Sequence, residues 1–387
     1  MRYSRRMDSL PPYLFAEIER KVAEKKKQGV DVISLGIGDP DMPTPEHIVA
    51  EMQRQVADPA NHQYPNNRGT EEFRSAVAAF YLKRFGVQLD PETEIIPLLG
   101  AKEGIAHICF NFLDEGDVCL GADPGYPVYA SGPILAGGTP VPLPLKPELN
   151  FQPDLDAIDA ETRKRAKMLF VNYPNNPTGA VIDDEDDFFA RLTEFGLEND
   201  IAILHDNAYS EITFDGYVAP SYLETAGAKE AGIEFYSLSK TYNMTGWRIG
   251  AIVGNADIIE KYWTLKSNMD SGMFQALQRV AAHALSGSQK CVEDMCDIYQ
   301  RRRDLVVSTL NDIGIEVTPP RGTIYIWVPV PDGYTSESFA TMVLDKCGVV
   351  VPPGSGYGPS GEGFVRISLT APDGRITEAL ERIRDNL

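Results

Sequence analysis

Short apolar runs with β-strand character alternate with amphipathic helical stretches along the middle of this chain. The apolar runs span residues 95–99, 117–122, 168–173, 201–206, 233–238 and 249–253. Helical patterns fill much of the sequence between them, for instance at 70–85, 103–113 and 185–199. Because parallel strands need crossover connections, this alternation predicts a mostly parallel α/β sheet with helices on both faces.

The two ends of the chain have a different pattern. A helix is predicted over residues 12–28, and a short strand that runs into a glycine loop over 33–41. A long helical stretch, 256–313 with a break near Gly287, leads to a C-terminal unit. There we expect strands at 315–318, 323–330 and 364–369, a helix at 336–346 and a terminal helix. The expected division is an N-terminal arm that also forms part of the small domain (1–45), a large domain (46–285) and a small C-terminal domain (286–387).

The charge of the chain narrows its possible partners. Its 387 residues carry a formal net charge of −20, which disfavours nucleic acid or an anionic membrane as the main partner. The apolar runs are shorter than the roughly 18 residues of a membrane span. The basic N-terminus has no apolar segment after it, so no secretory signal is expected. Five cysteines without metal-site or redox spacing predict reduced thiols, no metal centre and a cytoplasmic location.

The most informative polar segment follows the apolar run at 233–238. That run stops at a hydroxyl-rich turn that presents Lys240, and Arg248 comes eight residues later. A lysine held at such a turn can form an imine with an aldehyde, and Ser237 and Arg248 can bind a phosphate. An aldehyde and a phosphate on one small molecule describe pyridoxal 5'-phosphate.

Other polar residues also follow predicted strands, where ligands bind in α/β sheets. Asp206 ends an apolar strand, and a partly buried carboxylate there can keep a pyridine nitrogen protonated. Asn176 and Tyr209 are suited to hold the phenolic oxygen of the cofactor. Tyr126 is the candidate to cover one face of its ring.

Two further groups complete the expected site. Ala101 and Lys102 open a predicted helix, whose N-terminal N–H groups can bind the phosphate together with Ser237 and Arg248. Arg366 lies on a predicted strand of the small domain and can bind a substrate carboxylate in a bidentate manner. The loop Gly354–Gly358 lacks the lysine of a P-loop and is interpreted as a flexible lid before Arg366.

Taken together, these segments resemble the fold-type-I pyridoxal-phosphate enzymes, specifically the class I/II aminotransferases, over essentially the whole chain. The resemblance rests on Pro174–Gly179, the pair Asp206-x-x-Tyr209, the segment Ser237-Leu238-Ser239-Lys240 with Gly246–Gly250, and Arg366. It implies a large sheet domain of the seven-stranded type sandwiched by helices, plus a smaller α+β domain.

The resemblance also implies residue roles. Lys240 would carry the cofactor and transfer the substrate proton, assisted by Asp206 and Tyr209 as catalytic residues, while Ser239 joins Ser237 among the cofactor-binding residues. Tyr64 looks like the tyrosine that reaches the partner subunit's phosphate, which implies a homodimer with shared active sites.

Within the family, the ends of the chain look most like the LL-diaminopimelate aminotransferases. Tyr13, Gly38 and Asn268 resemble substrate-contact residues of that group, and Tyr126, Asn176 and Arg366 are expected to join them. The implied reaction is a ping-pong transfer between LL-diaminopimelate and 2-oxoglutarate. The segments 40–43 and 269–272 depart from the plant-type pattern, so an aspartate, alanine or aromatic aminotransferase stays open for the distal group of the substrate.

Some alternatives change the chemistry instead. A C–S β-lyase, racemase or decarboxylase would need the same Lys240 and Asp206, so the sequence separates these poorly. A cofactor-binding regulator is disfavoured because every catalytic position is filled and no DNA-binding extension is present. The acidic run Asp183–Asp187 is interpreted as a solvated helix cap rather than a metal site, and His205 as a core residue or a residue just behind the site.

Overall fold

A computed structural model describes residues 3–11, 14–183 and 186–387, with only the backbone described for 14–18. Within these residues the largest sheet has seven strands in the order β2-β8-β7-β6-β5-β3-β4. Their bounds are β2 Ile95–Leu98, β3 Val118–Asp123, β4 Thr139–Pro144, β5 Ala166–Val171, β6 Ala202–Asn207, β7 Gly232–Ser237 and β8 Gly250–Gly254. Only β8 runs antiparallel to its neighbours in this sheet. The predicted mostly parallel α/β architecture is therefore confirmed.

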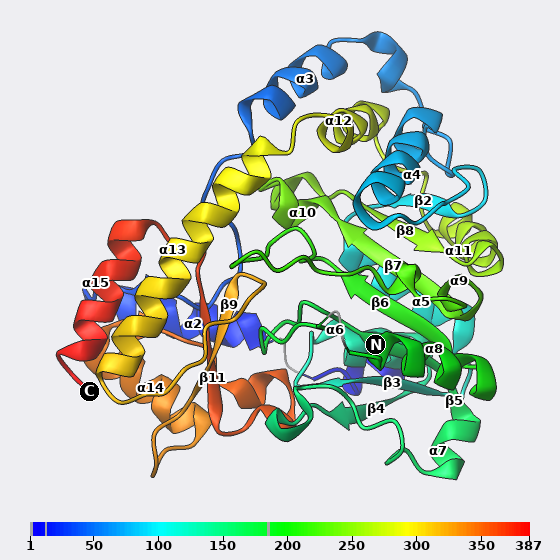
Figure 1. The fold of residues 1–387 in the computed structure, drawn as a ribbon. Coiled ribbons are helices and arrows are strands. Elements are labelled where there is room, and N and C mark those ends of the chain that lie inside the picture. The colour runs from blue at the N-terminus through cyan, green and yellow to red at the C-terminus, as the bar shows by residue number, and fades with distance from the viewer. Residues whose placement is uncertain (1–2, 12–13, 184–185) are drawn as a thin grey trace.

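Helices cover both faces of this sheet (Figure 1). On one face α5 (Ala101–Phe112), α6 (Val128–Ala136) and α11 (Ala256–Met269) pack on alternate strand residues such as Met168 and Phe170. On the other face α4 (Glu71–Phe85) and α8 (Phe188–Asn199) pack on the intervening residues, such as Leu169 and Val171, and α12 (Gln275–Ser286) packs against α4. Because both faces are buried, the central strands are mostly apolar, which made them visible in the sequence.

The smaller part brings the two ends of the chain together. Strand β9 (Tyr325–Pro329) pairs antiparallel with β11 (Phe364–Ser368), and β1 (Ile33–Ser34) pairs parallel with β10 (Val349–Val350). Around these strands lie α2 (Leu14–Lys27), α13 (Lys290–Asp312), α14 (Ser336–Cys347) and α15 (Asp373–Arg384). Shorter helices are α1 Arg5–Asp8, α3 Glu46–Val56, α7 Ala160–Arg165, α9 Ala228–Ala231 and α10 Leu238–Thr241. The division at residues 45 and 285 stays a prediction.

One strand was missed and two local predictions were wrong. Strand β4 was not expected, because its alternating prolines at 140, 142 and 144 lack N–H donors; the strand is tolerated because it lies at the sheet edge. Residues 315–318 form no strand in the described chain, since the Asn311 side chain binds both the N–H and the carbonyl of Val317. The stretch 256–313 breaks twice, at 270–274 and 287–289, rather than once.

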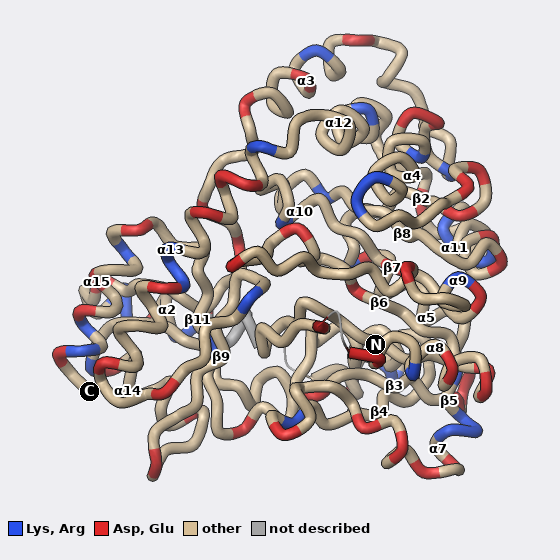
Figure 2. Tube along the Cα trace, in the orientation of Figure 1, with Lys and Arg blue, Asp and Glu red and all other residues tan. Residues whose placement is uncertain are grey.

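Charged residues cover the outside of the molecule. Figure 2 shows Asp and Glu spread over the outer helices and loops, with Lys and Arg interspersed among them. No helix in the described part of the chain is long and apolar enough to cross a membrane.

Candidate active site

The carboxyl ends of the central strands open into a cavity of about 330 Å³. Segments from the large sheet, from the loop after β1 and from the small β9–β11 sheet meet there. The predicted site residues that line it are Gly38, Ala101, Lys102, Tyr126, Asn176, Asp206, Tyr209, Ser237, Ser239, Lys240, Arg248 and Arg366. Residues more than 300 positions apart in the chain therefore form one site, as expected for the crevice of an open α/β sheet.

Lys240 lies on the short helix α10, directly after β7. The Ser237 hydroxyl accepts a hydrogen bond from the N–H of Ser239 and begins this helix. The Lys240 Nζ donates to the carbonyl of Gly38 at 2.6 Å. Burial lowers the pKa of Lys240, and the Arg366 and Arg248 guanidiniums lower it as well. A lysine that loses its proton more easily than usual is suited to act as a nucleophile and a base.

The residue that accepts this hydrogen bond, Gly38, must be a glycine because of a second neighbour, Tyr325. A Cβ on Gly38 would lie 1.9 Å from the hydroxyl oxygen of Tyr325, so no side chain fits there. Gly38 thus allows close packing of the loop after β1 against β9, and its carbonyl reaches the lysine.

Asp206 is an almost fully buried carboxylate at the end of β6. The Tyr129 hydroxyl donates to its Oδ2 at 2.8 Å, whereas Oδ1 is buried without a partner in the described residues. Burial raises the pKa of Asp206 to about 6. A buried acceptor without a donor is costly unless a ligand supplies one. A protonated ring nitrogen would do so, and the structure therefore fits the predicted cofactor at this position.

Arg366 reaches the cavity from β11, on the opposite wall. Its Nη1 donates to Asn176 Oδ1 at 2.8 Å, and its Nη2 donates to the Gly36 carbonyl at 2.7 Å. Its guanidinium carbon lies 3.9 Å from the ring centroid of Tyr325, whose hydroxyl is 3.3 Å from that of Tyr209. An arginine held in a fixed plane at a cavity wall is suited to bidentate binding of a carboxylate.

The remaining end of the cavity is suited to an anion. Helix α5 begins at Ala101 after Gly100, whose φ of 80° is in the left-handed region and whose Cβ, if present, would meet Arg248. Arg248 Nη1 donates to the Thr245 carbonyl at 2.7 Å. Backbone N–H groups, a guanidinium and the Ser237 and Ser239 hydroxyls together match a phosphate.

Two predicted residues, Tyr64 and Asn268, are not among the residues that line the cavity. Tyr64 is 88% exposed, and Asn268 is exposed with its amide nitrogen bonded to the Thr264 carbonyl at 2.8 Å. Tyr13 lies outside the described residues, as does part of the acidic run 183–187. Their predicted roles therefore stay predictions.

The sequence analysis also missed residues that the structure places at the site. Tyr325, Asn172 and Thr245 line the cavity, and Tyr129 contacts Asp206 from behind. Tyr126 lies just before α6 and Tyr129 in its first turn, where the Tyr129 N–H donates to the Tyr126 carbonyl at 2.9 Å; their closeness in the sequence was the available signal. Tyr325 and Asn172 lay inside apolar strand patterns that gave no signal.

The loop interpreted as a flexible lid is attached to the large sheet in this structure. Ser360 donates to the Asp123 carboxylate through its N–H and its hydroxyl, and the Gly125 N–H donates to the Tyr357 carbonyl at 2.9 Å. The loop thus lies against Arg366, whose guanidinium lies 4.8 Å from the Tyr357 ring centroid.

Comparisons with known proteins agree with this geometry. A family profile described as aminotransferase class I and II matches residues 30–383. The LL-diaminopimelate aminotransferase of Desulforudis audaxviator is 59% identical over 381 residues, covering 98% of this chain and 97% of that protein. The LL-diaminopimelate aminotransferase of Moorella thermoacetica is 53% identical over 384 residues, covering 99% and 98%.

Two solved structures have nearly the same fold as this chain. Substrate-bound BacF from Bacillus subtilis has a TM-score of 0.94 and 37% identity, covering 100% of this chain and 98% of that one. An aspartate aminotransferase variant from Thermus thermophilus has a TM-score of 0.92 and 30% identity, with 100% of both chains covered.

Proposed function

We propose a substrate and residue roles for this chain from the premise that it belongs to the class I and II aminotransferases. It is a pyridoxal-phosphate-dependent transaminase with the α/β fold of its structural neighbours. The proposed amino donor is LL-diaminopimelate and the proposed acceptor is 2-oxoglutarate. The named relatives support this choice, since they are 53–59% identical over nearly the whole chain.

Residues of this chain would hold the cofactor at both ends. Asp206 would accept a hydrogen bond from the ring nitrogen, Asn176 and Tyr209 would face the phenolic oxygen, and the start of α5 with Arg248 would bind the phosphate. Tyr126 would cover one ring face. When bound, pyridoxal 5'-phosphate supplies an aldehyde and an electron-accepting ring. The unpartnered Oδ1 of Asp206 is the single observation that carries this placement.

Lys240 and Arg366 would act on the substrate. Arg366 would bind the α-carboxylate of the substrate in a bidentate manner and so orient its Cα–H bond. Lys240 Nζ, whose pKa burial lowers, would remove the Cα proton and return a proton on the same side of the site.

Charges at the cavity wall support a substrate with a polar distal end. Glu19 and Lys102 line the same cavity as Arg366. LL-diaminopimelate carries a second ammonium and a second carboxylate, for which a carboxylate and an ammonium are complementary partners.

We also propose a cytoplasmic homodimer with shared active sites. Tyr64 is 88% exposed, and Met269 and Phe274, which flank Gly272, are 47% and 39% exposed. A Cβ on Gly272 would lie 3.0 Å from Pro65, so the two segments lie together. An exposed aromatic and apolar patch of this kind fits a protein interface. Tyr64 and Asn268 would then reach the partner's site.

Glutamate production tests the proposed substrate. Purified holoenzyme is given 2-oxoglutarate and, in turn, LL-diaminopimelate, aspartate, alanine and an aromatic amino acid. We expect kcat/KM for LL-diaminopimelate to exceed the others by at least about tenfold, the effect of one good polar contact. A higher value for another donor would replace the proposed substrate. Release of a keto acid without any need for 2-oxoglutarate would instead indicate a lyase.

A further inference from the structure

We infer that Tyr129 is a positioning residue that fixes the Asp206 carboxylate so that one chosen oxygen faces the cofactor ring nitrogen. The inference rests on the proposed function, in which Asp206 binds that nitrogen. It concerns a residue behind the cavity wall, which would act through Asp206.

Tyr129 and Asp206 are joined by a hydrogen bond in the protein interior. Tyr129 comes from α6 and Asp206 from β6, and the Tyr129 hydroxyl donates to Asp206 Oδ2 at 2.8 Å. Both side chains are buried, at 3% and 5% exposure. Because this bond occupies Oδ2, the carboxylate presents Oδ1, which has no partner in the described residues. The bond thus decides which oxygen is available to a ligand.

Aromatic neighbours hold the Tyr129 ring in place. Its ring stacks on Phe170 of the neighbouring β5, with centroids 5.1 Å apart and planes at 17°. On its other side it contacts Tyr126 edge to face, at 6.0 Å and 87°. Tyr126 is the residue expected to cover the cofactor ring. The turn that leads into α6 therefore supplies both the expected ring cover, Tyr126, and the support of the ring-nitrogen carboxylate, Tyr129, and aromatic packing holds both in place.

The Tyr129 hydroxyl also affects the pKa of Asp206. Burial raises the pKa of Asp206 to about 6, and the hydrogen bond from Tyr129 acts in the opposite direction. Without this hydroxyl, Asp206 would bind a proton at a higher pH. Burial also raises the pKa of Tyr129 well above its usual value, so Tyr129 stays a donor throughout the physiological range. The hydroxyl thus helps to keep Asp206 anionic near neutral pH.

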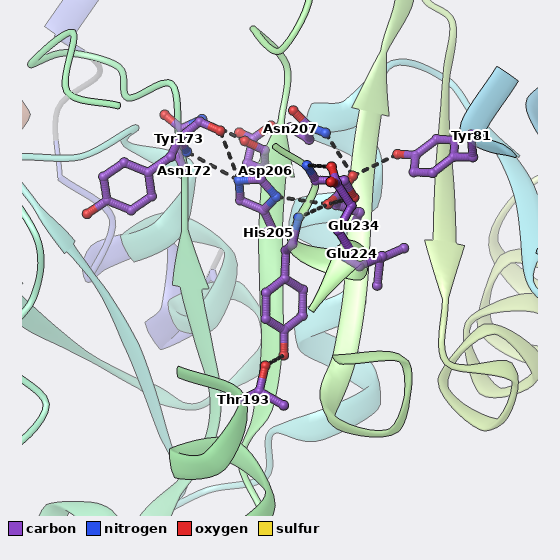
Figure 3. Close-up of polar contacts among 12 residues, drawn as sticks. Tyr81, Asn172, Tyr173, Thr193, His205, Asp206, Asn207, Glu224 and Glu234 are labelled. Carbon is purple, nitrogen blue, oxygen red and sulfur yellow. Dashed lines mark hydrogen bonds and ion pairs between the residues drawn. The ribbon is translucent and has the colours of Figure 1, made fainter. Parts of the chain in front are cut away.

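A second tyrosine offers a matched control on the other face of the sheet. The Tyr81 hydroxyl donates to Glu234 Oε1 at 2.8 Å, with both residues fully buried (Figure 3). The bond has the same length and the same donor and acceptor groups. Neither Tyr81 nor Glu234 lines the cavity. Removal of either hydroxyl takes one hydrogen bond from a buried carboxylate, so a difference in cofactor binding between the two variants reports on the site.

The experiment compares Tyr129→Phe and Tyr81→Phe as holoenzymes. The dissociation constant of pyridoxal 5'-phosphate is measured by dialysis at a series of pH values, with thermal unfolding recorded for each variant. We expect Tyr129→Phe to bind about tenfold more weakly at neutral pH, since a bond to a charged group is lost. The pH at which affinity falls should rise by about one unit, because Asp206 protonates more easily. Tyr81→Phe should leave that pH unchanged.

A cofactor analogue then separates positioning from general damage. In the 1-deaza analogue of pyridoxal 5'-phosphate, a C–H replaces the ring nitrogen. If Tyr129 acts through Asp206, the loss of affinity caused by Tyr129→Phe should disappear with this analogue. An equal loss with both cofactors, or an equal pH shift in Tyr81→Phe, would overturn the inference.

Asp206→Asn distinguishes this failure from a failure of the proposed function. If Asp206→Asn does not weaken binding of pyridoxal 5'-phosphate, the placement of the cofactor is wrong and the inference falls with it. If Asp206→Asn weakens binding and Tyr129→Phe does not, only the inference is wrong.

Discussion

Two buried carboxylates on neighbouring strands, Asp206 on β6 and Glu234 on β7, differ in how their oxygens are bonded. Glu234 accepts hydrogen bonds from the side chains of Tyr81, Asn207 and Ser221 and from the Tyr222 N–H, and contacts His205 Nδ1 at 3.1 Å (Figure 3). Asp206 accepts one side-chain bond, from Tyr129, and its Oδ1 has no partner in the described residues.

Their pKa values differ accordingly. Burial raises the pKa of Asp206 to about 6. Burial also acts to raise the pKa of Glu234, but hydrogen bonds from His205, Ser221 and Asn207 outweigh it, and the pKa is lowered. A carboxylate that is fully hydrogen-bonded stabilises the fold, whereas one that keeps a free oxygen costs stability and is available to a ligand.

Asp206 and Glu234 are connected through the residues on either side of Asp206. Asn207 and His205 flank Asp206 along β6, and both bind Glu234 on the face away from the cavity. His205 Nε2 in turn lies 3.1 Å from the carbonyl of Tyr173, at the start of the loop that carries Asn176. Glu234 therefore fastens β6, β7 and this loop to one another, which keeps Asp206 and Asn176 in place.

The largest expected effect tests the structural half of the comparison. Glu234→Gln removes the charge and turns an amide donor toward groups that themselves donate. Because a buried, hydrogen-bonded ion is replaced by a mismatched neutral group, we expect the free energy of unfolding to fall by about 3–5 kcal/mol. Urea unfolding of the cofactor-free protein measures this change.

An exposed glutamate provides the control for this variant. Glu92, which pairs with Arg74 and is 64% exposed in its side chain, should lose at most about 1 kcal/mol when changed to Gln. A similar small change for Glu234→Gln would contradict the structural role that we assign to Glu234.

The next effect tests the functional half. Asp206→Asn keeps the shape of the side chain but cannot carry the charge that a protonated ring nitrogen needs. We expect kcat/KM to fall about 10²–10³-fold, the usual result of removing one preorganised electrostatic group. The free energy of unfolding of the cofactor-free protein should rise by about 1–3 kcal/mol, since an unpaired buried charge is removed. Loss of both activity and stability would mean that Asp206 is structural, like Glu234.

Much of the fold could be predicted from the sequence, for a physical reason. The central strands are buried on both faces, so each gave a short, mostly apolar run that stood out in the sequence. Strand β4 could not be found in this way, because its prolines oppose pairing and only the edge position permits it. The strand predicted at 315–318 does not form, because the Asn311 side chain takes the place of a neighbouring strand as hydrogen-bond partner of Val317.

The candidate site was predictable where a polar residue follows a strand. Asp206, Lys240 and Asn176 stood out because each interrupts or ends an apolar run. Glu234 and Tyr129 did not, since their importance lies in contacts with residues 29 and 77 positions away. Such contacts depend on strand register and helix packing, which a single sequence does not give.

The smallest expected effect is that cofactor affinity and fold stability are lost over two different pH ranges. Asp206 has a raised pKa of about 6, so cofactor affinity should be present above that pH and fall as the pH drops through it, by up to about tenfold per pH unit. The fold should not weaken in this range, because protonation relieves the cost of the buried Asp206 charge. Glu234 has a lowered pKa, so its stabilisation is lost only below the ordinary range of a glutamate. Measured from about pH 8 to about pH 3, cofactor retention should therefore fall at a higher pH than the free energy of unfolding of the cofactor-free protein. If both fell together near pH 6, the two carboxylates would not differ in the way their hydrogen bonds indicate.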